Sequence, residues 1–154
     1  MTTDNQAMLE LLKENLRLLG KSRKTLMLSV EKASRIGEKA EYSFEEMETF
    51  DSLTSKFGRT SDLYTQKVIR TLWALMREPY VPFIDLMNQC EKSGIIVSAG
   101  LMLEIRDLRN QIIHEYIPET IQKLIPEVIA LSGKLEENIQ QTEIFLKQRD
   151  WFND

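Results

Sequence analysis

The sequence predicts an all-α fold: an up-and-down bundle of about five helices in one domain that spans residues 1–154. Apolar residues recur at the three- and four-residue spacing of a helix face, and no window alternates apolar and polar residues for long. Only six glycines and four prolines interrupt the 154 residues. The length suits one domain with a substantial core, and the 42% apolar and 29% charged residues are typical of a soluble protein.

The first helix is expected between about Asn5 and Ile36, because apolar residues recur there on one stripe. Gly20 is a candidate bend, and Gly37 is expected to end the helix. The stripe consists of Met8, Leu11, Leu12, Leu16 and Leu19.

The second helix is expected to open at Ser43, because Ser43 and Glu46 have the spacing of a capping box. The helical pattern stops at Gly58 and resumes after it, ending near Pro79. The side chains expected in the core are Phe44, Met47, Phe50, Leu53 and Phe57 before the glycine, and Leu63, Val68, Leu72 and Leu75 after it.

Two shorter helices are expected next. The first covers residues 82–90 and is closed by the Lys-Ser-Gly sequence at 92–94. The second is capped by Ser98 and ends around residues 113–116, before Pro118.

The last helix follows Pro118, and Pro126 is expected to interrupt or restart it. The sequence does not place the C-terminal Trp151 and Phe152. The core-facing residues of this helix are expected to be Ile121, Leu124, Ile125, Val128, Leu131, Leu135 and Ile139.

Several functional classes are disfavoured by composition. The longest mostly apolar run, residues 94–103, is about half the length of a membrane-spanning helix, and no secretory signal is visible at the N-terminus. Cys90 is the single cysteine, so we expect a small buried hydrophobic residue in a reducing cytoplasm. No metal-ligand spacing and no glycine-rich phosphate loop occur, so neither a metal nor a cofactor is expected.

A compact set of groups suited to phosphate chemistry surrounds the only histidine of the chain. Arg109 supplies a permanent cation whose forked donors match phosphate oxygens. His114 can exchange protons near neutral pH, and Tyr116 adds a hydroxyl group. The full string is Arg109-Asn110-Gln111-Ile112-Ile113-His114-Glu115-Tyr116.

A helical projection separates these groups from the core. Arg106, Asn110 and His114 are spaced four apart and share one side of the helix. Arg109 and Tyr116 flank the apolar stripe on its other edge. The stripe itself is expected to be Leu101, Ile105, Leu108 and Ile112. His114 therefore lies outside the stripe, unlike a histidine that only fills a core.

This string resembles the Arg-x-x-x-x-His-x-Tyr signature of HEPN proteins, specifically the HepT-like toxins and the related substrate-binding partners of minimal nucleotidyltransferases. The signature usually has Asn after the Arg, as Arg109-Asn110 has here. The flanking segments 94–98 and 104–108 and the upstream segment 57–67 are also similar to the family. The resemblance covers roughly residues 40–130.

The resemblance implies a metal-independent endoribonuclease, the toxin of a toxin–antitoxin pair, with a composite site in a homodimer. Arg109 and His114 would be catalytic, and Arg106 would be a secondary cation for the phosphate. Asn110 would orient His114 or donate to a phosphate; alternatively, it is a solvated polar group on the helix surface. A nucleotidyltransferase antitoxin would transfer AMP to Tyr116; alternatively, the Tyr116 ring completes the core beside the helix end. A different class of function is a non-catalytic module that binds a substrate or nucleotide for such a partner. A purely structural helical dimer would leave the motif unexplained.

The net charge of −4 argues against an extended nucleic-acid surface. RNA contact must therefore be confined to a local cleft, and no DNA contact is expected. Asp107 and Glu115 are expected to be surface charges or charge partners of the arginines. The residues available to build the cleft are Arg59, Lys67, Arg70, Arg106 and Arg109, with residues 21–24 as a lesser candidate.

Overall fold

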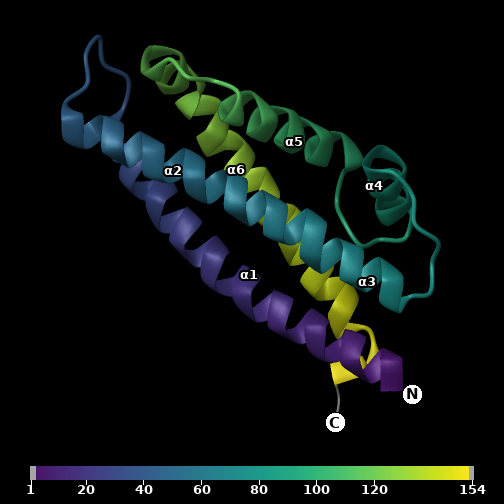
Figure 1. Ribbon diagram of the computed structural model, residues 1–154. Helices are drawn as coiled ribbons and strands as arrows, with labels where there is room; N and C mark the ends of the chain where they lie inside the picture. Colours follow the sequence, from purple (N-terminus) through teal and green to yellow (C-terminus); the bar gives the residue numbers. More distant parts are fainter. Residues whose placement is uncertain (1–2, 153–154) are drawn as a thin grey trace.

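The computed structural model describes residues 3–152, and all regular structure in this range is helical (Figure 1). Five helical rods are present, which confirms the predicted all-α class. In chain order the elements are α1 (Thr3–Ile36), α2 (Phe44–Asp62), the π-helix η1 (Leu63–Ile69), α3 (Arg70–Leu75), α4 (Phe83–Lys92), α5 (Ala99–Ile113), α6 (Pro118–Lys147) and the 3₁₀ turn η2 (Asp150–Phe152). The elements α2, η1 and α3 follow one another without a break and form one rod.

The long rods run alternately in opposite directions (Figure 1). Helix α1 packs against the α2–η1–α3 rod and against α6, and α6 also packs against α2 and α5. Helix α5 lies over α2 and α6, and α4 packs on α5. No helix within residues 3–152 is both long and apolar enough to cross a membrane.

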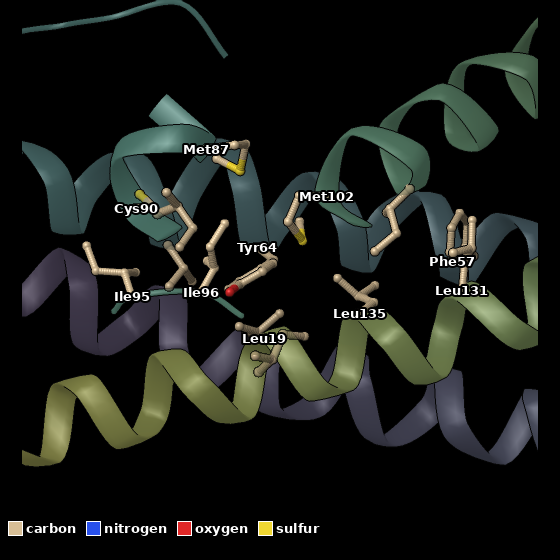
Figure 2. Packing of buried hydrophobic residues seen from close by; sticks show 14 of the residues in the cluster. Leu19, Phe57, Tyr64, Met87, Cys90, Ile95, Ile96, Met102, Leu131 and Leu135 are labelled. Carbon is tan, nitrogen blue, oxygen red and sulfur yellow. The ribbon is translucent and has the colours of Figure 1, made fainter. Parts of the chain in front are cut away.

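The core runs the length of the bundle. Figure 2 shows Tyr64 of η1 among Leu19, Met102 and Leu135, which come from three other helices. The Tyr64 side chain is completely buried, and its hydroxyl lies 3.0 Å from the carbonyl oxygen of Asn138. Cys90 is also completely buried, as predicted.

The predicted helix boundaries are confirmed where capping chemistry sets them. Ser43 and Glu46 form a complete capping box at the start of α2, and the Ser98 hydroxyl accepts a hydrogen bond from the Leu101 N–H at the start of α5. Gly37 and Gly94 follow α1 and α4 with φ of 72° and 78°, a conformation that glycine adopts without strain.

Two predicted breaks are wrong. Helix α2 continues through Gly58, and α6 continues through Pro126. The buried neighbours Phe57, Ile125 and Val128 anchor both segments in the core, and this packing outweighs the weak helix propensity of glycine and proline. Helix α1 likewise continues through Gly20.

Three predicted core positions are also wrong or shifted. Phe44 is 73% exposed because it is the first residue of α2 and precedes the buried part of that helix. Leu11 is 52% exposed on α1. In α5 the buried stripe includes Met102, while Leu101 is only half-buried.

Candidate functional site

A groove of about 540 Å³ lies between α5 and the start of η1. Helix α5 contributes Arg106, Arg109 and Asn110, so the structure brings three of the five predicted site residues together. The opposite wall consists of Ser61, Asp62, Leu63, Thr65, Gln66 and Lys67.

The π-helical segment Leu63–Ile69 forms most of this opposite wall. Its buried residues Tyr64 and Val68 hold it against the core, and the exposed Gln66 and Lys67 lie on the outer side. π-Helical turns are rare and occur frequently at functional sites. Nothing in the hydrophobic spacing of the sequence distinguishes this segment from an α-helix.

Arg109 is fixed in the groove by two acceptors. Its Nη2 donates to the Asp62 carboxylate at 2.5 Å, and its Nη1 donates to Oδ1 of Asn110 at 3.1 Å. A methyl group added at Gly58 would lie only 3.8 Å from Cγ of Arg109, so the arginine stem runs closely along α2. The orienting effect expected of Asn110 therefore acts on Arg109 and not on His114.

Arg106 lies one turn earlier on α5, with its guanidinium carbon 4.4 Å from the centroid of the Phe83 ring. Within residues 3–152, the Nε atoms of Arg106 and Arg109 are the two buried side-chain polar atoms that have no hydrogen-bond partner. A buried donor without a partner costs roughly 1–3 kcal/mol. These two Nε donors are therefore unsatisfied within the chain, and a movement of either side chain that exposed its Nε would let it donate to an anion.

The groove is positively charged although the chain is acidic. Three cations, Arg106, Arg109 and Lys67, line it together with one carboxylate, Asp62. Next to the groove is a smaller hollow of about 260 Å³. Arg59 and Arg109 both line this hollow. The structure thus contains a local basic cleft of the kind expected from the sequence.

The remaining predicted basic residues lie elsewhere. The guanidinium of Arg70 donates to the carbonyl oxygen of Val81 at 2.7 Å, so it lies outside the groove. In the segment 21–24, Arg23 pairs with Glu136 and Glu143 of α6. Arg23 therefore joins α1 to α6.

His114 does not line the groove. It is the residue that caps the C-terminal end of α5, with φ of −90° and ψ of 0°, and its backbone N–H donates to the carbonyl oxygen of Asn110 at 3.2 Å. Helix α5 ends at Ile113, so His114 is the first residue beyond its regular turns. Its imidazole is exposed to solvent.

Tyr116 is 87% exposed, so the alternative in which its ring completes the core is wrong. Ile113 and Ile117 are 48% and 55% exposed, and with Tyr116 they form an exposed apolar cluster next to His114 in the sequence. The Glu115 carboxylate accepts hydrogen bonds from the N–H groups of Tyr116 and Ile117. Glu115 therefore stabilises the turn before α6 and is not a charge partner of the arginines.

Sequence reasoning missed Asp62 as a site residue. Asp62 and Arg109 are 47 positions apart, and no local pattern relates them. Asp62 lies in the segment 57–67, but its acidic side chain has no distinctive spacing there. No group of three or more His, Cys, Asp or Glu side chains in the described range is arranged to hold a metal ion.

Comparisons of the chain with protein-family models, curated proteins and solved structures gave no match. The HEPN resemblance therefore rests on the motif at residues 109–116 and its flanking segments alone.

Proposed function

We propose that this protein is a metal-independent endoribonuclease, the toxin of a HEPN-type toxin–antitoxin pair, which acts as a homodimer. The observation that carries the proposal is the groove that Arg106, Arg109 and Lys67 line together in an otherwise acidic chain. Phosphate oxygens are the acceptors that forked guanidinium donors fit best.

The chemistry requires a base, an acid and a cation. A base removes the proton from an RNA 2′-hydroxyl, whose oxygen attacks the adjacent phosphorus, and an acid protonates the departing 5′-oxygen. Arg109 would stabilise the negative charge that develops on the phosphoryl oxygens. His114 would serve as base or acid, and Arg106 and Asn110 would support phosphate binding.

A second protomer is needed in this mechanism. Each chain has one histidine, and His114 lies beyond the end of the groove of its own chain. A two-fold axis near the end of α5 would bring two His114 imidazoles and two arginine grooves together. The exposed cluster of Ile113, Tyr116 and Ile117 supports pairing there, because apolar side chains favour burial at an interface.

The test measures cleavage of single-stranded RNA in EDTA by the wild type, Arg109→Ala and His114→Ala. Loss of the arginine should lower the rate by about 10²- to 10³-fold, and loss of the histidine by about 10²- to 10⁴-fold. Arg35→Ala is the matched control, because Arg35 is an exposed arginine at the end of α1. Unchanged cleavage in both site variants would contradict the proposal.

Tyr116 is the proposed site of AMP transfer by a partner nucleotidyltransferase. Its exposure of 87% makes the hydroxyl accessible, and an adenylyl group would add bulk and negative charge beside the site. After co-expression with such a partner, mass spectrometry should find AMP on the Tyr116 peptide. The peptide of Tyr80, which is 80% exposed, is an internal control; AMP on both or on neither would contradict a specific transfer.

One observation favours the second candidate, a binding module that presents a nucleotide to a nucleotidyltransferase. The groove has cations for phosphate, but its one carboxylate, Asp62, is paired with Arg109, and His114 is not among the residues that line it. Under this alternative the unmodified wild type would bind a nucleotide without cleaving RNA, and Arg109→Ala would weaken that binding.

A further inference from the structure

Tyr80 is an aromatic residue that is held in place although its ring is 80% exposed. It lies between Pro79 and Pro82 in the segment that joins α3 to α4. Exposure of a large ring on a connecting segment is usually accompanied by freedom to move, but here the backbone on both sides of the ring is restricted by a proline.

Side chains of the α3 helix fix the segment further. Nε1 of Trp73 donates to the carbonyl oxygen of Pro79 at 3.0 Å, and Nη1 of Arg70 donates to that of Val81 at 2.7 Å. The guanidinium carbon of Arg70 lies 4.7 Å from the centroid of the Tyr80 ring. One face of the ring therefore lies against a cation, and the exposed remainder is available to solvent.

Two residues that contact or adjoin this segment, Arg70 and Phe83, lie near residues that line the basic groove. Arg70 follows Lys67 of the groove wall by three residues, about one helical turn. Phe83, three residues after Tyr80, is the ring that packs against Arg106. The groove and the Tyr80 ring are thus connected through Lys67 and Arg70 on one side and through Phe83 and Arg106 on the other.

We propose that Tyr80 is a stacking platform for a nucleobase of single-stranded RNA whose backbone phosphates lie in the groove. This inference rests on the proposed RNA substrate and adds a base subsite to it. A flat ring with a cation behind it suits base stacking, which tolerates any base because every base has a π-face. A duplex keeps its bases stacked on each other, so the platform selects single strands.

The experiment measures binding of a fluorescent single-stranded RNA oligonucleotide by anisotropy, in EDTA and in the non-cleaving His114→Ala background. Tyr80→Ala and Tyr80→Leu should weaken binding by roughly 5- to 100-fold, whereas Tyr80→Phe keeps the ring and should stay within about twofold. Phe44→Ala is the matched control, because Phe44 is 73% exposed at the opposite end of the α2–η1–α3 rod (Figure 1).

The outcomes separate the platform from the nuclease. Cleavage by the wild type together with unchanged binding in Tyr80→Ala would overturn the platform and leave the nuclease standing. Full RNA affinity in Tyr80→Leu would mean that Tyr80 makes an apolar contact without stacking. Weaker RNA binding in Tyr80→Phe would mean that the Tyr80 hydroxyl makes the contact. Either result would overturn the stacking platform. If the His114→Ala protein binds no single-stranded RNA and the wild type cleaves none, both proposals fail.

Discussion

Arg109 has two hydrogen-bond acceptors in the groove, and one of them carries a charge. The Asp62 carboxylate and a substrate phosphate would compete for the same guanidinium fork. The pair is only partly screened from water, with Asp62 43% and Arg109 29% exposed at the side chain. Such a pair contributes little to stability, about 0–1 kcal/mol.

We therefore predict that Asp62→Asn tightens binding of single-stranded RNA and lowers the free energy of unfolding by less than about 1 kcal/mol. The amide removes the negative charge from the groove while keeping the size of the side chain. Asp51→Asn is the control, since it removes the same charge roughly 16 Å earlier along α2. Weaker RNA binding in Asp62→Asn would contradict this prediction. It would show that the Asp62 carboxylate helps binding by orienting Arg109 more than its negative charge hinders binding.

Tyr64 gives a pH-dependent prediction. Burial raises the pKa of Tyr64 above its usual value, and the hydrogen bond with Thr142 opposes this only in part. The unfolded chain loses the phenol proton near pH 10, whereas the folded chain keeps it to higher pH. The contribution of Tyr64 to stability is thus complete below about pH 10 and is lost as the pH rises further.

The Tyr64→Phe variant should be less stable than the wild type at neutral pH by roughly 0.5–1.5 kcal/mol, because the bonds of its hydroxyl are lost. Above about pH 10 the wild type should lose stability by up to about 1.4 kcal/mol per pH unit more than the variant. Urea unfolding at several pH values measures both effects. Parallel pH profiles for the two proteins would contradict a buried, protonated phenol.

At the residue scale, the sequence predicts the direction of a side chain better within a helix than at the end of the helix. Projection correctly separated Arg106 and Asn110 from the buried Ile105 and Leu108, because helical periodicity fixes these directions. It also placed His114 outside the apolar stripe, and His114 is exposed, but periodicity does not give the direction of its side chain, since α5 ends one residue before it. The termination depends on the turn that Glu115 stabilises, and helical periodicity does not report that turn.

Helix α5, which carries the arginines, is positioned by a buried asparagine of α6. Oδ1 of Asn138 accepts hydrogen bonds from the N–H groups of Val97 and Ser98 at 3.0 and 3.2 Å. Its Nδ2 donates to the carbonyl oxygen of Lys134 at 2.8 Å. Both polar atoms of the Asn138 side chain are therefore hydrogen-bonded, and the side chain fixes the backbone at the start of α5.

Asn138→Leu should lower the free energy of unfolding by roughly 2–4 kcal/mol, because the partly buried N–H groups of Val97 and Ser98 lose their acceptor and the buried side chain is replaced. Hydrogen exchange should also become faster in the first turn of α5. Gln140→Leu is the control: Gln140 is exposed on the same helix, so its effect should stay within about 0.5 kcal/mol. A stable Asn138→Leu protein with unchanged exchange would contradict this role.

At the scale of elements, capping and turn residues were predictable because their chemistry is local, as at Ser43 and Gly94. Gly58 and Pro126 were not, because tertiary packing keeps both inside continuous helices. Asn138 was missed because it shares a face with the apolar residues of α6, and sequence alone does not show its backbone partners. No residue type or spacing in the sequence distinguishes the π-helix η1 from an α-helix.

The charge distribution matters for the whole molecule. A net charge of −4 with a basic groove limits phosphate contact to a few residues, so the salt dependence of RNA binding should be shallow compared with that of an extended basic surface. The sequence predicted a local basic cleft and four of the residues that line it, Lys67, Arg106, Arg109 and Asn110. It did not predict the pairing of Asp62 with Arg109 or the fixed ring of Tyr80, which depend on contacts between distant segments.

The most direct test of the composite site measures EDTA-resistant RNA cleavage over a range of protein concentrations at which sedimentation gives the mass. We predict that cleavage per chain rises with the fraction of particles at twice the 18.0 kDa chain mass. At concentrations where the variants are dimeric, Arg109→Ala and His114→Ala should not cleave. A cleaving monomer, or a stable dimer of unmodified wild type that does not cleave, would contradict the account.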